Sequence, residues 1–102
     1  MAARIIDASV PRMLPALDAI NRVFWTGGRD GALLVHRCQS CHRWSHPPRD
    51  RCVQCGGELR AEAVSGRGAV FTFTVNEHQF HPNVPPPNLI AIVQLEEQDD
   101  LR

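Results

Sequence analysis

The sequence predicts a mainly β protein with a helix near its N-terminus, and three observations lead to that prediction. Two Cys-x-x-Cys pairs, Cys38–Cys41 and Cys52–Cys55, lie close together near the middle of the chain. Residues 69–75 and 89–95 have the apolar, β-branched and aromatic composition of strands. Residues 12–25 instead repeat apolar side chains at helical spacing. The whole chain has 102 residues, about the size of one domain.

The four cysteines predict a metal site. Each Cys-x-x-Cys turn can direct two sulfurs to one point, and two such turns supply the four thiolates of a tetrahedral zinc ion. The predicted ligands are Cys38, Cys41, Cys52 and Cys55. Because four thiolates leave no open position, the zinc is expected to be structural rather than catalytic. The ten residues between the pairs, 42–51, are long enough to run out and back as two short strands with a turn at 47–50.

Other uses of the cysteines fit less well. A disulfide inside Cys-x-x-Cys is typical of redox enzymes, which carry one such motif beside a βαβ unit rather than two facing motifs. Four thiolates also allow an iron–sulfur or single-iron site. His36 and His42 lie beside the first pair, but the cysteines already fill the site. Reduced, metal-binding thiolates fit a reducing compartment, which predicts a cytoplasmic protein.

Composition excludes some classes of partner. All eleven basic residues are Arg, and they balance eleven Asp and Glu, so the formal net charge is zero. This balance argues against a strongly cationic nucleic-acid-binding protein. The sequence has no apolar run long enough to span a bilayer and no signal segment at its start, so no membrane association is expected.

The helical pattern over 12–25 should end at Gly27–Gly28. The residues that recur at three- and four-residue spacing are Leu17, Ile20 and Phe24. A helix of this length is marginal alone, so its apolar stripe must dock on something. The pair Phe24–Trp25 is expected either to close the local core or to contact another protein.

Short strands are predicted around the cysteines, over 33–35, 44–46 and 59–64. Trp44 should pack the ribbon or shield the metal sulfurs. A turn over 65–68 then leads to the two longer strands.

In the strand over 69–75, strict alternation places Phe71, Phe73 and Val75 on one face and Val70, Thr72 and Thr74 on the other. The strand over 89–95 is nearly continuously apolar, which predicts burial on both faces. The loop between them, 76–88, holds four prolines, and residues 96–100 are expected to be a solvated acidic end or a hairpin turn. Two long strands cannot close a β domain, so the chain is expected to stop before its sheet is complete.

In this order, the segments resemble a family of small zinc-ribbon/OB-fold proteins, first catalogued as a domain of unknown function and found next to thiolase-like enzymes. The resemblance is carried by the helix ending in Phe24–Trp25, by GALLVHRC (31–38), HPPR (46–49), CVQCG (52–56) and SGRGAVFTFT (65–74), by the Pro-rich loop, and by IAIVQL (90–95).

The resemblance implies a helix and a rubredoxin-like zinc ribbon followed by a five-stranded OB barrel. We therefore expect an N-terminal arm and helix over 1–30, a zinc ribbon over 31–62 and a partial OB-fold over 63–102. The family's barrel normally continues past the position of Leu95, so the barrel is expected to be truncated here.

The resemblance also implies a non-catalytic partner subunit in a hetero-oligomer with a thiolase-like catalytic subunit. Such enzymes act on acyl-CoA thioesters by thiolysis or retro-aldol cleavage, steroid side chains included. The partner subunit would supply an interface, stability and acyl-CoA access. The residues expected to contact the partner or acyl-CoA are Phe24, Trp25, Trp44, Arg49, Arg67, His78, Phe80 and His81.

No catalytic residue is predicted, because no Ser/His/Asp order or Gly-rich phosphate loop is present and the cysteines are committed to metal. The alternative function is a single-stranded nucleic-acid-binding zinc-ribbon/OB module. The zero net charge, the absence of Lys and the few aromatic residues count against it. A stand-alone acyl-CoA-binding protein is a third possibility.

Overall fold

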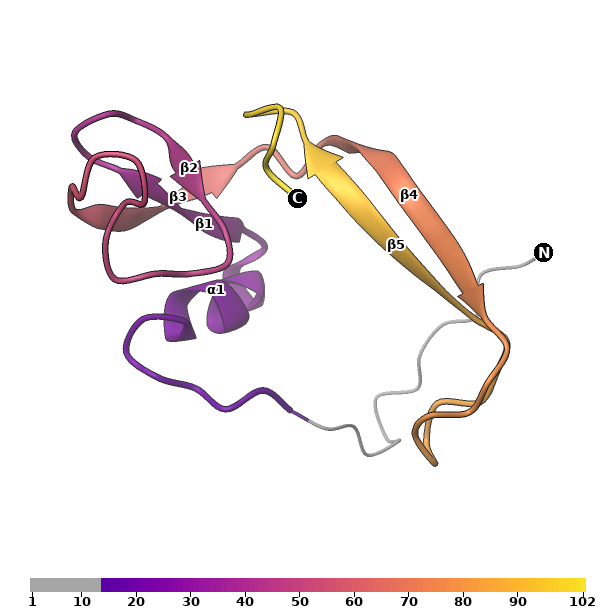
Figure 1. Cartoon of the computed structure of the whole chain (residues 1–102). Coiled ribbons are helices and arrows are strands. Elements are labelled where there is room, and N and C mark those ends of the chain that lie inside the picture. Colours follow the sequence, from indigo (N-terminus) through magenta and orange to yellow (C-terminus); the bar gives the residue numbers. More distant parts are fainter. Residues whose placement is uncertain (1–13) are drawn as a thin grey trace.

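The computed structural model describes residues 14–102 (Figure 1). The elements, in chain order, are α1 (Arg22–Thr26), the 3₁₀-helix η1 (Gly27–Asp30), β1 (Leu33–Cys38), β2 (Trp44–Ser45), β3 (Leu59–Val64), β4 (Gly68–Asn76) and β5 (Asn88–Leu95). The predicted class, mainly strands with a helix near the N-terminus, is confirmed.

The ribbon sheet is three-stranded and antiparallel, in the order β2-β1-β3. Its register pairs His36 with both Ser45 and Ala61, so β1 is the central strand. The prediction that residues 42–51 run out and back as two short strands is met only in part. Trp44 and Ser45 form β2 beside β1, whereas on the return Arg51 alone pairs, in a single bridge with Glu58.

Within the described residues, the observed helix is much shorter than the predicted one over 12–25. Residues 14–21 are not helical, and α1 has five residues. The cause is local. The Asp18 carboxylate accepts hydrogen bonds from the N–H groups of Ile20 and Asn21, at 2.8 and 2.7 Å, and the Asn21 side chain bonds the backbone at Asp18 and Ala16. Such short polar side chains offer the backbone partners that compete with helical hydrogen bonds. The predicted residues 12 and 13 lie outside the described part.

The helical segment also ends later than predicted. The chain continues through Gly27–Gly28 as η1 and stops at Gly31, where φ is +76°. Gly27 does not end the helical segment. It is needed for packing, because a Cβ there would lie 2.9 Å from Leu34 Cδ1. The helical segment therefore rests directly on β1.

The hydrophobic core is small. Val35, Trp44 and Leu101 are buried together, with Val64 and Leu95 packed against them. These residues come from the ribbon sheet and from the C-terminal end of the chain, so the core joins the ribbon sheet to the end of β5. With so few buried apolar residues, a bound metal would add substantially to stability.

The C-terminal turn (residues 96–101) is not simply a solvated acidic end. Gln98 bonds the backbone of Trp44, Asp100 forms an ion pair with Arg43, and Leu101 enters the core. The backbone N–H of Leu95 also donates to the carbonyl of Leu101, at 2.8 Å. The C-terminal turn therefore ties β5 to β2.

The hairpin formed by β4 and β5 is antiparallel, with a bulge between Val70 and Thr72. Because of the bulge, Val70 and Phe73 lie opposite Val93 and Ala91, on one face. The predicted alternation, which put Val70 and Phe73 on opposite faces, is therefore wrong at this point.

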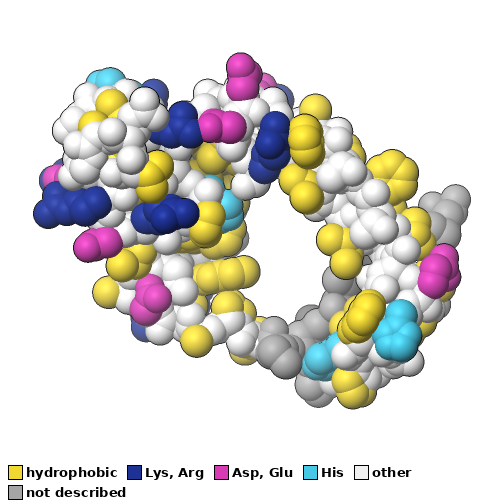
Figure 2. All heavy atoms as spheres, viewed as in Figure 1, with side chains coloured by type: hydrophobic (Ala, Val, Ile, Leu, Met, Phe, Trp, Pro, Cys, Tyr) yellow, Lys and Arg dark blue, Asp and Glu magenta, His cyan; other side chains and the backbone are white. Residues whose placement is uncertain are grey.

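The prediction that residues 89–95 are buried on both faces is also wrong for this chain by itself. Ile90 is 56% exposed on one face and Leu89 59% exposed on the other. The reason is that the hairpin forms a separate sheet of two strands, which cannot cover its own faces. Figure 2 shows its hydrophobic side chains, in yellow, exposed along the strands.

The molecule is extended, because the hairpin projects away from the ribbon sheet and α1 (Figure 1). The radius of gyration is 15.9 Å, whereas a compact chain of this length has about 13 Å. Within residues 14–102, the structure contains no helix with the length and apolar character needed to cross a membrane.

Candidate functional site

Two turns of the same geometry hold the four cysteines. In the first knuckle (residues 38–43), the N–H of His42 donates to the carbonyl of Cys38, and in the second knuckle (residues 52–57) the N–H of Gly56 donates to the carbonyl of Cys52. His42 and Gly56 both have left-handed φ, at 65° and 73°. The backbone N–H of each leading cysteine is also bonded five residues on, to Arg43 and Gly57. The two knuckles are therefore structural equivalents that face each other.

The sulfurs of the two knuckles converge. All four Sγ atoms lie within 4.8 Å of one another. Two pairs that cross between the knuckles are closer still, with Cys38 Sγ 3.4 Å from Cys55 Sγ and Cys41 Sγ 3.7 Å from Cys52 Sγ. A tetrahedron of sulfurs about 2.3 Å from a zinc ion has edges of about 3.8 Å. The four cysteines are free, so no disulfide competes with metal binding.

Backbone N–H groups favour the thiolate form in each knuckle. The N–H of Cys41, and then that of Ser40, donate to Cys38 Sγ and lower the pKa of Cys38 to about 6. The N–H groups of Cys55 and Gln54 likewise lower the pKa of Cys52. Hydrogen bonds to the charged form of a group stabilise that form. The leading sulfur of each pair is thus prepared to bind a cation.

The pKa of Cys55 shows that the four sulfurs need a positive ion in order to ionise together. The N–H of Gly57 alone would lower its pKa, but the neighbouring sulfurs of Cys38 and Cys41 raise it to about 11. Neighbouring thiolates repel, so all four groups ionise together only around a positive ion. The donor set therefore fits a Cys₄ structural zinc ion, with all four positions filled by protein.

Gly57 lets the second knuckle approach the first. A Cβ at this position would lie 2.8 Å from Cys38 Sγ and 2.9 Å from Ser40 Oγ. No larger residue fits there without moving a metal ligand. This glycine could not be singled out from the sequence, because the requirement comes from a contact across the two knuckles.

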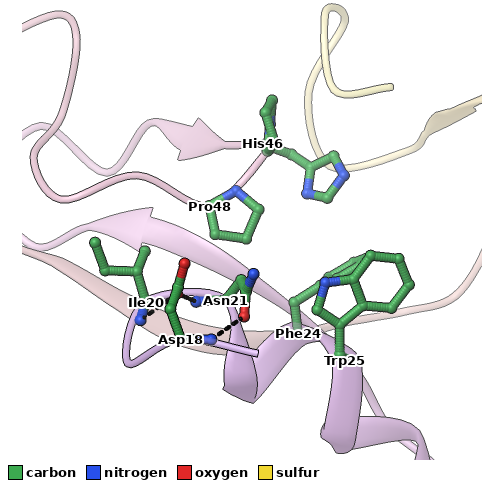
Figure 3. Close-up of a pocket in the computed structure, with 8 residues that line it drawn as sticks. Asp18, Ile20, Asn21, Phe24, Trp25, His46 and Pro48 are labelled. Carbon is green, nitrogen blue, oxygen red and sulfur yellow. Dashed lines mark hydrogen bonds between the residues drawn. The ribbon is translucent and has the colours of Figure 1, made fainter. Parts of the chain in front are cut away.

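A second feature is a pocket of about 480 Å³ between α1 and the segment that follows β2 (Figure 3). Phe24 and Trp25 line it from α1, and His46 and Pro48 line it from the facing segment. The ring centroids of Phe24 and Trp25 lie 5.1 Å apart, edge to face, and those of Phe24 and His46 lie 4.7 Å apart. We call this site the aromatic pocket. The pair Phe24–Trp25 was expected either to close the local core or to contact another protein, and its two members differ. Phe24 packs locally, whereas Trp25 is 51% exposed.

His46, Pro48 and Asp18 are not among the site residues predicted from the sequence. Asp18 lines the aromatic pocket with the residues just named. The signal present in the sequence was the Asp-x-x-Asn spacing before the aromatic pair, which is a local turn pattern. That His46 faces Phe24 could not be read from the sequence, because the two lie on different elements.

The remaining predicted contact residues do not form one site. Trp44 is buried in the core, with the Arg37 guanidinium 4.8 Å from its ring centroid. Arg67 is exposed and forms an ion pair with Glu96, at 3.0 Å. Arg49 is exposed in the segment between β2 and the second knuckle.

The last three predicted contact residues lie in the loop between β4 and β5, away from the ribbon sheet. There His78 contacts Phe80, with ring centroids 4.6 Å apart, and Phe80 is 78% exposed. His81 forms an isolated bridge with Val84. This loop and the aromatic pocket are therefore two separate regions.

Comparisons with known proteins agree with the fold and the metal centre. Residues 25–60 match the family model described as ChsH2, rubredoxin-like zinc ribbon domain. A solved structure titled Ltp2-ChsH2(DUF35) aldolase contains a chain that superposes with a TM-score of 0.74 at 29% identity, over 82% of this chain and 67% of that one. A Thermomonospora curvata protein named probable enoyl-CoA hydratase alpha subunit is 33% identical over 91 residues, which is 85% of this chain.

The chain thus carries a rubredoxin-like zinc ribbon of the ChsH2 type, and its described fold is similar to a chain of the Ltp2-ChsH2(DUF35) aldolase. The resemblance stated from the sequence, to a zinc-ribbon family first catalogued as a domain of unknown function, is confirmed. The predicted zinc cofactor is supported by the same ribbon match and by the cysteine cluster. This chain spans 28% of the length of the Thermomonospora relative.

Proposed function

We propose that this chain is a non-catalytic partner subunit of a thiolase-superfamily enzyme that acts on acyl-CoA thioesters. The observation that carries the proposal is the similarity to a chain of the Ltp2-ChsH2(DUF35) aldolase, which combines a TM-score of 0.74 with 29% identity. The relative named as a hydratase alpha subunit supports a role within a multi-subunit enzyme. The catalytic subunit would make or break a carbon–carbon bond, with steroid side chains as one substrate class.

The exposed hairpin supports an interface role. Leu89, Ile90 and Phe73 are 59%, 56% and 63% exposed, and no charged residue occurs within β4 or β5. Large exposed apolar surfaces mark sites that further protein covers, and the barrel strands that the resemblance implies after Leu95 would cover part of this surface as a partner would. The hairpin, α1 with the aromatic pocket, and the Pro-rich loop would then be the surfaces that meet other protein in the assembly.

Access of acyl-CoA is the finer part of the proposal. Arg49 is exposed and its guanidinium has the fork geometry that pairs with phosphate, whereas Arg67 already bonds Glu96. The exposed His78–Phe80 pair offers an apolar face and a polar ring to a pantetheine arm. Trp44 would act indirectly, by holding the ribbon in shape, because it is buried.

We propose that the zinc ion is structural. Cys38, Cys41, Cys52 and Cys55 would hold it, and its chemistry there is the cross-linking of the two knuckles. The chain's own contribution is to orient these sulfurs with backbone N–H groups and to close the site with Gly57. Catalytic groups would then belong to the partner subunit.

The test is co-expression with a thiolase-like protein from the same genome; we expect its gene to lie beside the gene of this chain. The two should elute together from a gel-filtration column as a zinc-containing complex, and thiolysis or retro-aldol activity should require both. Separate elution, with full activity of the catalytic protein alone, would reject the proposal. Binding of a single-stranded oligonucleotide at submicromolar concentration that weakens steeply with salt would favour the nucleic-acid module instead.

A further inference from the structure

We propose that the aromatic pocket is a docking site for a segment of a partner protein that presents an aliphatic or aromatic side chain next to an Arg. The inference rests on the proposed function only in naming that partner as the catalytic subunit. It adds where on this chain the partner anchors and what chemistry the anchor has.

The walls of the aromatic pocket favour an apolar side chain. Figure 3 shows His46 and Pro48 on one side, facing the side chains of α1 and the turn before it. Phe24, Trp25 and Ile20 supply the opposite apolar wall. Anchoring residues in protein interfaces are typically large side chains that fill such a pocket. The half-exposed Trp25 indole offers the largest surface for such a contact.

The charge at the aromatic pocket favours a cation beside that apolar group. Asp18 is the only carboxylate among the residues that line the pocket, and no Lys or Arg lines it in the described part of the chain. Asp18 Oδ1 accepts two backbone hydrogen bonds, while no bond to Oδ2 occurs within residues 14–102. Burial, and then nearby His36, lower the pKa of His46, which disfavours a compensating positive charge on its ring. A guanidinium can pair with the free carboxylate oxygen and stack on an indole ring.

The turn that carries Asp18 is fixed before any partner arrives. The Asp18 N–H donates to Asn21 Oδ1 at 2.9 Å, the Asn21 amide donates to the carbonyl of Ala16 at 3.1 Å, and the N–H of Arg22 donates to the carbonyl of Asp18 at 3.1 Å. A rigid site loses little conformational entropy on binding. The carboxylate is therefore positioned at the edge of the aromatic surface by the chain itself.

The first experiment measures the affinity of the two-protein complex by titration with the catalytic subunit. Trp25→Ala should weaken binding by about tenfold or more. Asp18→Asn should weaken binding by about three- to tenfold at low salt and have less effect at high salt. Val53→Ala and Asp99→Asn, at exposed positions that do not line the pocket, are the matched controls and should leave the affinity unchanged.

The outcomes separate this inference from the proposed function. If the complex forms and both pocket variants bind as the wild type does, the docking site is wrong while the partner role stands. If Trp25→Ala weakens binding but Asp18→Asn has no effect at any salt concentration, the cationic part of the proposal is wrong. Circular dichroism of each variant confirms that it is folded before its affinity is interpreted.

The second experiment does not depend on the partner's identity. The zinc-loaded chain is titrated with acetyl-Leu-Arg-amide and with acetyl-Leu-Glu-amide, and the NMR signal of the Trp25 indole N–H is followed. The Arg dipeptide should shift this signal and bind several-fold more tightly than the Glu dipeptide, and Asp18→Asn should remove the difference. Equal effects of the two dipeptides, or no shift of the indole signal with either, would overturn the proposal even if no complex had formed in the first experiment.

Discussion

The side-chain carboxamide of Gln98 makes two hydrogen bonds with the backbone of Trp44: it accepts from the N–H at 2.9 Å and donates to the carbonyl at 3.0 Å. These are the two backbone groups that a neighbouring strand would bond. Since β2 is an edge strand of the ribbon sheet, Gln98 takes the place of a further strand at that edge. It thereby fixes the C-terminal turn, and with it the hairpin, to the ribbon.

The first prediction follows from this contact. Gln98→Ala leaves both backbone groups of Trp44 without their partners, and unsatisfied buried groups cost about 1–3 kcal/mol each. The midpoint of thermal unfolding should therefore fall by about 8 °C or more, at about 4–8 °C per kcal/mol for a domain of this size. The comparison is with Gln54→Ala, an exposed position for which the structure shows only a backbone hydrogen bond. Equal midpoints for the two variants would contradict the role of Gln98.

The second prediction concerns the metal. Purified chain should contain about one equivalent of zinc, and Cys38→Ser should lose it together with the cooperative unfolding transition. The reason is that a structural zinc ion contributes about 10–16 kcal/mol of apparent binding free energy to the folded state. Atomic emission measures the metal and circular dichroism the unfolding.

The control for the metal prediction is Val53→Ala, in the second knuckle but 65% exposed, which should keep both the zinc and the transition. A Cys38→Ser variant that still binds one equivalent of zinc tightly would show that the predicted ligand set is wrong.

The third prediction compares two glycines. Gly57→Ala puts a Cβ 2.8 Å from Cys38 Sγ, whereas Gly28→Ala meets nothing within 4 Å. Disturbing the support of a metal ligand typically lowers affinity about 10- to 100-fold. Competition with a chromogenic chelator should show that loss for Gly57→Ala, while Gly28→Ala should bind zinc as the wild type does. Unchanged affinity in both variants would mean that the knuckles can separate without cost.

The fourth prediction is a pH dependence at the C-terminal turn. The Arg43 guanidinium, and then the Gln98 amide, hold the pKa of Asp100 below its usual range. A carboxyl whose pKa is lower in the folded than in the unfolded state stabilises the fold above its unfolded pKa, about 3.9 for Asp. That contribution is lost as the pH falls through the folded-state pKa.

Asp100→Asn should therefore unfold at a lower temperature than the wild type at pH 7, and the difference should shrink as the pH falls below about 4. Acid also releases zinc, but it does so in both proteins, so their difference isolates the carboxyl. Asp99→Asn, at the neighbouring exposed position, is the control and should unfold like the wild type at each pH. A difference between Asp100→Asn and the wild type that persists at pH 2.5 would contradict the assignment.

The metal centre was predictable because its information is local. Two Cys-x-x-Cys turns, each closed by its own backbone, define where four sulfurs point, and the left-handed residues His42 and Gly56 follow at the same offset in both. The strands over 59–64, 69–75 and 89–95 were predictable for the same kind of reason, since composition and period act within a few residues.

The helix was predicted too long because the helical apolar repeat competes with local hydrogen bonds of polar side chains in the same segment. The apolar repeat over 12–25 is helical, but Asp18 and Asn21 bond the nearby backbone and turn the chain before the helix can begin. A periodicity count registers the apolar positions and not the hydrogen bonds of the polar positions between them.

By itself, the sequence determined the ligand set, the mainly β composition and the family resemblance, since these depend on residues near one another in the chain. Only the tertiary structure decided that Gln98 completes the edge of β2, that Leu101 belongs to the core beside Val35, and that His46 faces Phe24. Each of these contacts joins distant segments through packing. Packing depends on which surfaces are left uncovered once all the elements have formed, and no short stretch of sequence contains that information.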